Sequence, residues 1–289
     1  MPKSPGEYTR REWTRLRPLV DSYKHYRHQI YETHLLRRPA RGGDLADAIN
    51  RVRGCDVILT VAFNAPDKIA MQAALLRKFI PHALYVVLDN SNDDRIAGEI
   101  ERVARAADAP YIRLPPAPWQ GREAGRSHAL AMNWAWRHIV VQGEPEAFGF
   151  IDHDIYPVVA TNPFAPLQDY PVAGRIWVRP PRWHLWAGFC FFRFDEVRQR
   201  RLDFGRDWLA GVDTGGRNWW PLYRYLDLEK VVDPGLKSEA IVPGISADEC
   251  SIERIGDWLH EGQFKDARRD LRSEKDAIVQ SRMQALLAG

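Results

Sequence analysis

The chain has 289 residues, of which 45% are hydrophobic and 27% charged, and its formal net charge is +3. This composition is ordinary for a soluble globular protein of one large domain or two small ones. No apolar run approaches the roughly 20 residues that a bilayer-spanning helix needs. The first residues also lack the apolar stretch of a signal peptide, so a secreted or membrane-spanning protein is not expected.

The cysteines and the charge distribution indicate the cellular compartment and the kinds of partner to expect. Cys55, Cys190 and Cys250 lie far apart and form no C-x-x-C pair, which suits a reducing compartment and predicts a cytoplasmic protein. Residues 1–53 hold 12 Lys/Arg and 6 Asp/Glu, so the basic excess is N-terminal. It is too diffuse to indicate a nucleic-acid-binding stripe, and no nucleic-acid partner is expected.

Residues 10–38 have the spacing of a helix with one apolar and one basic face. The apolar stripe, which Arg27 interrupts, consists of Trp13, Leu16, Val20, Tyr23 and Ile30. The favoured interpretation is a helical arm packed on the main domain. The alternative is a basic aromatic helix on an anionic membrane surface, which would make the protein peripheral at the inner face of a membrane.

Strands and helices alternate from residue 55 onward. Short apolar runs bounded by turn residues predict four buried strands, at residues 56–63, 83–88, 111–114 and 147–151. Amphipathic segments between them predict three helices, at residues 66–80, 96–107 and 126–141. This order predicts an α/β fold with right-handed crossovers and a mostly parallel sheet flanked by helices.

The pattern changes after Pro157. Residues 172–178 and 188–193 predict strands, and residues 218–226 predict a helix. Six of the eleven tryptophans fall between Trp177 and Trp220. We expect a mixed-sheet region that shares one core with the first half.

Asp152-His153-Asp154 is the most informative motif of the chain. It follows a predicted strand, at the carboxyl end where open α/β sheets bind ligands. Two carboxylates one residue apart can hold a hard divalent cation, which in turn can hold a diphosphate. His153 is expected to point the other way, since strand side chains alternate. The alternative is a solvated acidic turn.

Four stretches, taken together in their order, resemble the GT-A fold glycosyltransferases, especially the family 2 type, over roughly residues 55–262. They are a first-strand end at 60–64, an Asp-Asn-Ser turn at 87–93, a Gly-rich, Asn-ended helix start at 121–133, and the Asp-x-Asp at 152–154. The resemblance implies a GT-A type fold and a hexosyltransferase that takes a nucleotide diphosphate sugar, with UDP as the expected nucleotide.

The resemblance also implies a metal site. Asp154 would bind the metal, and Asp152 would contact ribose or the metal through water. A late histidine often joins such sites, and His260 fits by position. An imidazole beside carboxylates favours Mn²⁺ over Mg²⁺, and the alternative for His260 is a surface or core histidine.

Besides Asp152, five residues are predicted to contact the donor. Ala62 and Asn64 end the first strand, and Asp89 can accept a hydrogen bond from a base N–H or a ribose hydroxyl. The alternative for Asp89 is an Asx turn or a helix N-cap. Arg126, at a helix start, is expected to contact phosphate unless it is merely solvated. Trp186 is the candidate platform for a sugar ring, although most tryptophans should be core.

An inverting glycosyl transfer needs a base that takes the proton from the acceptor hydroxyl. In the family that acid lies beyond an acceptor-side strand, at a helix start. Asp213, in an Asp-Thr-Gly stretch, is the best match, and Asp207 is the second choice. The alternative for Asp213 is a simple N-cap.

The resulting division is an N-terminal helical extension at 1–50, a GT-A-like domain at 51–265 and a C-terminal helix at 266–289. The domain has a donor half at 51–157 and an acceptor half at 158–265. The expected acceptor is a carbohydrate or glycolipid hydroxyl, as in bacterial surface polysaccharide synthesis. Two alternatives stay open: a non-catalytic GT-A-like binding or scaffold domain, and a sugar nucleotidyltransferase, although the Gly-rich signature it would need is absent after the first strand.

Overall fold

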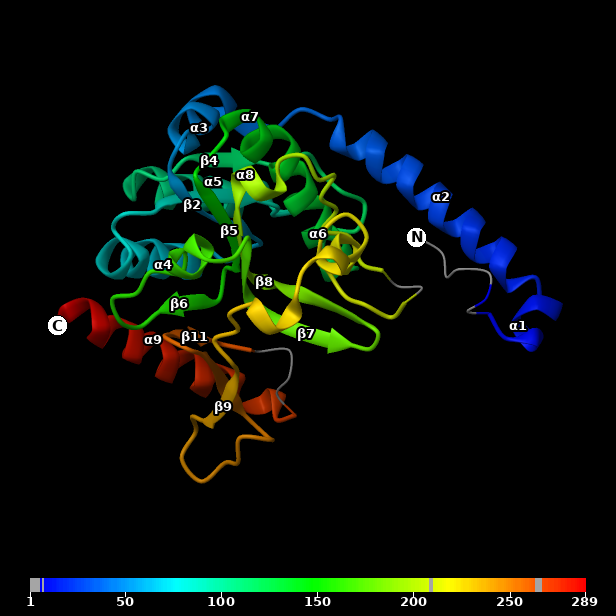
Figure 1. The fold of residues 1–289 in the computed structure, drawn as a ribbon. Coiled ribbons are helices and arrows are strands. Elements are labelled where there is room, and N and C mark those ends of the chain that lie inside the picture. Colours follow the sequence, from blue (N-terminus) through cyan, green and yellow to red (C-terminus); the bar gives the residue numbers. More distant parts are fainter. Residues whose placement is uncertain (1–5, 7, 208–209, 263–266) are drawn as a thin grey trace.

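The computed structural model describes residues 6, 8–207, 210–262 and 267–289. Its central sheet has seven strands in the order β1-β4-β3-β2-β5-β8-β7 (Figure 1). These strands are β1 (Gly42–Gly43), β2 (Asp56–Ala62), β3 (Leu84–Asp89), β4 (Tyr111–Arg113), β5 (Ala147–Asp152), β7 (Val172–Arg179) and β8 (Arg182–Arg193). β2 is parallel to β3 and β5, and β3 to β4, whereas β1, β7 and β8 pair antiparallel. The predicted α/β fold, a parallel sheet that continues into a mixed region, is confirmed.

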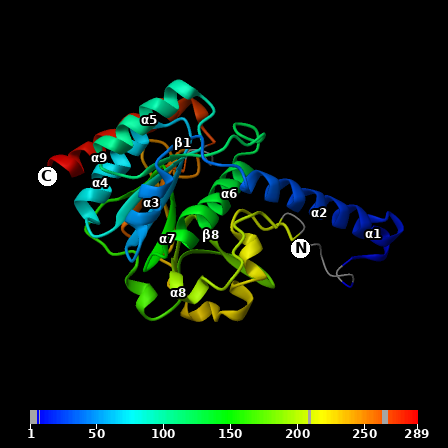
Figure 2. The same ribbon diagram turned by 90° about the horizontal axis from the view of Figure 1, so that it is seen from above.

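Helices cover both faces of the sheet (Figure 2). Along β2, Val57 and Leu59 face the core that includes α3 and α6, whereas Ile58 faces the core that includes α4 and α5. This alternation is the period of two expected for a strand buried on both faces. The helices are α3 (Leu45–Val52), α4 (Pro66–Phe79), α5 (Asp94–Ala106), α6 (Ala124–Ala135), α7 (Val141–Gly143) and α8 (Phe194–Val197). A π-helical turn, Trp136–Val140, joins α6 to α7, so the predicted helix at 126–141 is one continuous segment.

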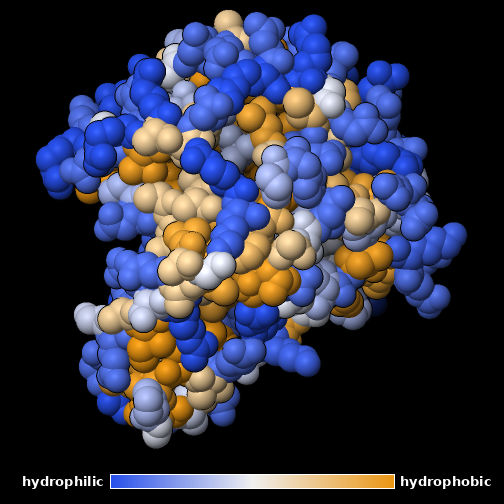
Figure 3. Space-filling view, turned by 90° about the vertical axis from the view of Figure 1, so that its left-hand side faces the viewer, coloured by the Kyte–Doolittle hydropathy of each residue, from blue (hydrophilic) through white to orange (hydrophobic). Residues whose placement is uncertain are grey.

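A second sheet, in the order β6-β11-β10-β9, was not expected from the sequence. Its strands are β6 (Ile155–Pro157), β9 (Lys237–Ala240), β10 (Ser251–Ile255) and β11 (Trp258–His260). The C-terminal helix α9 (Arg272–Ala288) packs with it around a third hydrophobic core. Figure 3 shows this side of the molecule from the left of Figure 1, with hydrophobic residues gathered in its middle and lower parts.

The hairpin of β10 and β11 brings a distant part of the chain to the main sheet. Ile255 lies opposite Trp258, and the two residues between them form the turn. Gly256 has φ +54°, as tight two-residue hairpin turns require. β11 then pairs with β6, so that His260 lies opposite Ile155, directly after the Asp-x-Asp turn.

The N-terminal helical arm is present and contacts the main domain, but it does so through its polar face and leaves its apolar stripe exposed. The arm consists of α1 (Arg10–Thr14) and α2 (Arg17–Leu36), which extend away from the body (Figures 1 and 2). Asp21 and His25 are buried, whereas Ile30 is 73% exposed. The polar face packs inward because it carries the partners of buried charges on the body, as Glu32 pairs with Arg217 at 2.8 Å.

Two other local expectations also differ from the structure. The predicted helix at 218–226 is wrong: the chain makes two short 3₁₀ turns there, Gly216–Trp219 and Tyr223–Tyr225. The C-terminal helix α9 begins at Arg272, and its predicted start at 266 lies outside the described residues. Among the helices that are described, none has both the length and the apolar character needed to cross a bilayer.

Candidate metal and nucleotide site

Parallel pairing brings three strand ends to one edge of the sheet. Ala62 of β2 pairs with Asp89 of β3, and Val61 pairs with Asp152 of β5. The carboxyl ends of neighbouring parallel strands form the crevice in which α/β proteins bind ligands. The residues predicted from the sequence to meet the nucleotide and the metal therefore share this edge.

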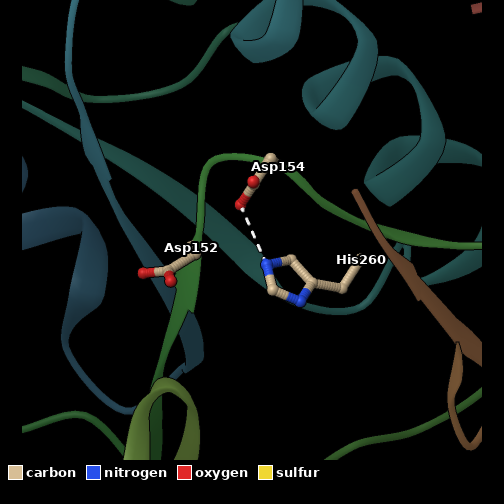
Figure 4. A group of neighbouring side chains, drawn as sticks. All are labelled: Asp152, Asp154 and His260. Atoms are coloured by element: carbon tan, nitrogen blue, oxygen red, sulfur yellow. Dashed lines mark ion pairs between the residues drawn. The ribbon is translucent and has the colours of Figure 1, made fainter. Parts of the chain in front are cut away.

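Asp152, Asp154 and His260 form a group of three metal-ligand side chains. Each offers one donor atom, and these atoms lie within 4.8 Å of one another. Figure 4 shows Asp154 and His260 directed toward each other, with Asp152 beside them. The gap between Asp154 Oδ1 and His260 Nε2 is 3.6 Å. The two acids come from the end of β5 and the turn after it, and the histidine comes from β11, about a hundred residues later.

A buried glutamine holds the backbone of the Asp-x-Asp turn through two hydrogen bonds. Gln72 of α4 is fully buried, and its Nε2 donates to the carbonyl oxygens of Asp152 at 2.9 Å and Ile155 at 2.7 Å. The Tyr85 hydroxyl donates to Gln72 Oε1 at 2.7 Å. Because the amide is satisfied at both ends in a dry setting, it has one stable orientation, and the turn that presents the two acids is held in place before any ligand binds.

Two glutamates hold the histidine side of the site. The ring of His260 hydrogen-bonds through Nδ1 to Glu253 Oε2 at 2.7 Å, and both residues are buried. The backbone N–H of Glu261 donates to the carbonyl oxygen of Asp154 at 3.1 Å. The Glu261 carboxylate pairs with Lys68 and accepts a 2.6 Å hydrogen bond from Tyr156.

The electrostatics of the group suit a cation. Burial works against ionisation of Asp154, but nearby His260, His153 and Lys68 outweigh it and hold its pKa below the usual range. Burial lowers the pKa of His260, but Asp154 and the hydrogen bond to Glu253 raise it above the usual value. A neutral ring that donates Nδ1–H to Glu253 turns the lone pair of Nε2 toward Asp154, so two acceptors face each other. Carboxylate–histidine pairs of this kind support metal ligands, and the donor set fits Mn²⁺ or Mg²⁺, with the imidazole favouring Mn²⁺.

Asp89 has a structural role at the strand tip. It is 1% exposed, and its two oxygens accept hydrogen bonds from the Tyr111 hydroxyl at 2.7 Å and from the Ser91 N–H at 2.9 Å. The bond from the N–H two residues on is that of an Asx turn. The structure thus supports the alternative that the sequence left open, and the predicted contact of Asp89 with a nucleoside is untested.

Asn64 and Ala62 line the first-strand end. Ala62 is buried, and its carbonyl oxygen accepts from the N–H of Asn90 at 2.9 Å. Asn64 has φ +49°, which is uncommon outside glycine. Its N–H donates to Ser91 Oγ at 2.9 Å and its side chain to Asn92 at 2.7 Å. This network joins the ends of β2 and β3 and leaves Asn64 partly exposed at their tip.

Arg126 lies at the start of α6 as predicted, but it contacts the N-terminal arm. Its guanidinium stacks on Trp119 at 3.3 Å from the ring centroid and bonds to His28 of α2. Glu32 of the same helix lies 3.9 Å away. Its positive charge therefore already has protein partners, and its contact with a phosphate remains a prediction.

Trp186 lies against the metal group. Its ring centroid is 5.1 Å from that of His260. A Cβ added at Gly188 would lie 2.4 Å from the Trp186 ring and 2.5 Å from Asp152 Oδ2. Only glycine therefore allows these two side chains to approach the backbone of β8 together. Trp186 is partly exposed, whereas Trp208, another tryptophan of this half, lies outside the described residues.

Asp213 and Asp207 differ in a way that bears on the choice of base. The Asp213 side chain is 47% exposed and pairs with Arg206 at 3.0 Å. It caps no helix, since the 3₁₀ turn that follows has Gly215 at its N-cap and no side-chain cap. Asp207 is 2% exposed and pairs with Arg182 at 2.6 Å. An acceptor hydroxyl that arrives from solvent can reach the half-exposed Asp213 but not the buried Asp207, so Asp213 is the better candidate of the two.

Helix α6 links Asp213 to the metal group. A Cβ at Gly125 would lie 3.7 Å from Asp213 Oδ1, and His128 Nε2 lies 3.5 Å from Asp152 Oδ1. Residues three apart share a helix face. Asp213 and Asp152 therefore flank the same first turn of α6.

Sequence reasoning missed the residues that position the metal group: Gln72, His128, Glu253 and Glu261. For Glu253 and Glu261 a signal existed, because Gly256-Asp257 between two apolar runs marks a two-residue hairpin. For Gln72 none existed, since a polar residue inside an amphipathic helix normally faces solvent.

Comparison with known proteins adds a structural context. No family model matches the chain, and no curated protein matches it. Among solved structures, it is similar to the galactosyltransferase LgtC in complex with donor and acceptor sugar analogs, at 14% identity and a TM-score of 0.37, over 50% of this chain and 59% of that one. It is also similar to the mannosyltransferase PcManGT from Pyrobaculum calidifontis in complex with GDP-Man and Mn²⁺, at 16% identity and a TM-score of 0.37, over 60% of this chain and 52% of that one.

A third similar structure is glucosyl-3-phosphoglycerate synthase from Mycobacterium tuberculosis in complex with Mn²⁺ and UDP-Glc, at 19% identity and a TM-score of 0.28, over 50% of each chain. The match thus covers between half and three fifths of the length of each of these three structures. At these low scores the function has to be argued from the site itself.

Proposed function

We propose that this protein is a metal-dependent glycosyltransferase that moves a sugar from a nucleotide diphosphate sugar to an acceptor hydroxyl. The observation that carries the proposal is the chain Glu253–His260–Asp154 at the carboxyl edge of the sheet. His260 Nε2 lies 3.6 Å from Asp154 Oδ1 in a buried setting, where either a proton on the ring or a metal cation between the two atoms would compensate the charge of Asp154. Asp152 stands beside it at the tip of β5, where the diphosphate of a donor would lie.

Each residue of the site has a defined role in the proposal. Asp152, Asp154 and His260 would hold Mn²⁺ or Mg²⁺, which when bound neutralises charge on the leaving diphosphate. Ala62 and Asn64 form the edge against which the nucleoside, expected to be uridine, is placed. Trp186 provides a flat surface next to the metal group for the transferred sugar.

Asp213 completes the proposal as the general base. Its carboxylate is half-exposed and faces the first turn of α6, opposite Asp152. There it takes the proton from the acceptor hydroxyl as the oxygen attacks the anomeric carbon from the side away from the diphosphate, which gives inversion. The proposed acceptor is a carbohydrate or glycolipid hydroxyl, as in bacterial surface polysaccharide synthesis, and the proposed location is the cytoplasm.

Calorimetric titration with UDP, with and without Mn²⁺, tests the proposal. The wild-type chain should bind UDP only with the metal, and Asp154→Ala should lose that binding while its thermal unfolding stays cooperative. Asp169→Ala, which removes an exposed carboxylate elsewhere, is the matched control. If Asp154→Ala binds UDP–Mn²⁺ as well as the wild type does, the site is elsewhere.

A second measurement separates the enzyme from a GT-A-like scaffold. Nucleotide sugars are first screened for thermal stabilisation in the presence of Mn²⁺, which identifies the donor. Slow hydrolysis of that donor by the wild type, but not by Asp154→Ala, would support an enzyme. Metal-dependent binding without turnover against any acceptor would favour the scaffold.

A further inference from the structure

Helices α1 and α2 expose an apolar face to solvent. Of the large hydrophobic side chains that are exposed in the described chain, most lie on this arm: Trp13, Leu16, Leu19, Val20, Tyr23, Tyr26, Ile30 and Tyr31. Leu19 is 64% exposed, Tyr23 66% and Ile30 73%. The six of them that belong to α2, from Leu19 to Tyr31, follow the helical period and so lie on one side of that helix. A contiguous exposed patch of this kind is a mark of an interaction surface.

The outward direction of this face is fixed by the opposite face of α2. Glu32 pairs with Arg217 at 2.8 Å, and Arg217 is itself buried and also paired with Asp203. Asp21 is buried and bonded to Arg17 at 3.0 Å. Turning the helix to bury Tyr23 and Ile30 would leave Arg217 with less compensation for its charge, which is costly in a buried site.

The exposed charges of the arm are all positive. Nine basic side chains between residues 10 and 41 are exposed: Arg10, Arg11, Arg15, Arg17, Lys24, Arg27, Arg37, Arg38 and Arg41. The three acidic residues in that range, Glu12, Asp21 and Glu32, are buried or only partly exposed. Arg27 lies within the apolar face of α2, and Lys24 lies at its edge. The arm is therefore apolar, aromatic and cationic on its solvent side.

We propose that α1 and α2 form a docking surface for an anionic membrane. Leu and Ile side chains would enter the boundary between head groups and acyl chains, tyrosines would lie at the head-group level, and the basic side chains would pair with anionic lipids. A second copy of the chain fits this face less well, because a twofold interface would bring the same positive side chains together.

The docked arm would hold the candidate site close to the membrane. α2 contacts the start of α6 through His28 and Arg126, and Asp152 and Asp213 flank that same helix turn. A glycolipid acceptor would then be within reach of the site. Docking itself needs no donor or acceptor, so it stands or falls separately from the glycosyl-transfer proposal.

Co-sedimentation of the full chain with vesicles tests the docking surface. Vesicles of phosphatidylcholine mixed with phosphatidylglycerol should bind the wild type, and pure phosphatidylcholine vesicles should bind it much less. Lys24→Glu/Arg27→Glu should weaken binding by more than about 25-fold, since each basic residue at an anionic surface contributes about fivefold. Tyr23→Ser/Ile30→Ser should also weaken it, and added salt should weaken it for the wild type.

Two matched variants control for surface changes elsewhere. Arg102→Glu/Lys230→Glu reverses two exposed charges away from the arm, and Val159→Ser/Val178→Ser removes two exposed hydrophobic side chains. Both should bind vesicles as the wild type does, and circular dichroism should show equal helix content in all variants. The proposal is overturned if the wild type ignores anionic vesicles, if the controls lose binding equally, or if light scattering shows a dimer that Tyr23→Ser/Ile30→Ser breaks while vesicle binding is absent.

Discussion

The two sides of the candidate site are built differently. On the metal side, Asp154 and His260 are buried and held by Gln72, Glu253 and the backbone of Glu261. On the other side, Asp213 is half-exposed and held by Arg206 at the surface. Metal ligands keep a fixed geometry when neighbouring residues hold them in place. The metal side is therefore suited to bind one kind of group, a metal ion with its diphosphate. The open side is suited to meet an acceptor that arrives from solvent.

A buried histidine strengthens this contrast. Both ring nitrogens of His184, on β8, lack a hydrogen-bond partner within the described part of the chain, and the residue is 2% exposed. Burial lowers its pKa to about 4 against the opposing charge of Asp213, so the ring is neutral near pH 7. Unsatisfied buried groups are rare, and this one lies on the acceptor side, whereas the buried ligands of the metal side have partners.

The largest expected effect is on the open side. Asp213→Asn keeps the size of the side chain but cannot take a proton, so it should lower turnover by roughly 10²–10⁴-fold. Donor affinity should stay near that of the wild type because the metal group is untouched. Steady-state kinetics with the identified donor and acceptor, together with calorimetric titration of UDP–Mn²⁺, would measure both quantities.

The control for Asp213 is another acid of the same half. Asp169→Asn removes an exposed carboxylate that is not part of the site, and its turnover should match the wild type. Near-normal turnover in Asp213→Asn would show that Asp213 is not the general base. The role would then move to Asp207, the second choice from the sequence, or to Asp248 or Glu249, two further acids of the same half, or the mechanism would retain configuration.

A smaller effect is expected from the support of the metal side. Glu253→Gln keeps an oxygen for the Nδ1–H of His260 but removes the charge that orients the ring. Loss of such a supporting carboxylate typically costs about 10–100-fold in metal affinity. Titration of Mn²⁺ in the presence of UDP would measure it. Glu239→Gln, on the neighbouring strand β9, should leave the affinity unchanged, and an unchanged affinity in Glu253→Gln would show that His260 is no metal ligand.

The sequence predicted the parts of the fold and site that depend on local pattern. Buried strands ended by polar turns placed Ala62, Asp89 and Asp152 at one sheet edge, because parallel strands end together. His260 was predicted by position in a family pattern, and the structure brings it to within 3.6 Å of Asp154. The strand-end predictions needed only the period of the strands and their order, whereas the prediction of His260 depended on the family resemblance.

The parts that the sequence did not predict depend on pairing between distant segments. Glu253 meets His260 only because β10 and β11 form a hairpin, and β11 reaches Asp154 only by pairing with β6. The outward apolar face of α2 is set by Glu32 and the buried Arg217, 185 residues away. An amphipathic pattern shows that a helix has an apolar and a polar face. It does not show that a buried charge on another segment will draw the polar face inward.

The smallest effect concerns the nucleoside edge, where the structure gives Asp89 a turn-holding role. Asp89→Asn turns one of its two acceptors into a donor. If the amide oxygen stays on the Ser91 N–H, the Tyr111 hydroxyl loses its 2.7 Å acceptor and keeps only the Ala97 carbonyl oxygen at 3.3 Å. The net cost of one such hydrogen bond is about 1 kcal/mol of unfolding free energy, which denaturant unfolding would measure. Affinity for uridine, which carries no phosphate, should stay unchanged, because both Asp89 oxygens face protein donors. Asp93→Asn, at the exposed N-cap of α5, controls for a general loss of turn structure near the edge.

A marked loss of uridine affinity in Asp89→Asn alone would show instead that Asp89 contacts the nucleoside directly. The nucleoside edge would then, like the metal side, bind its ligand through a buried carboxylate.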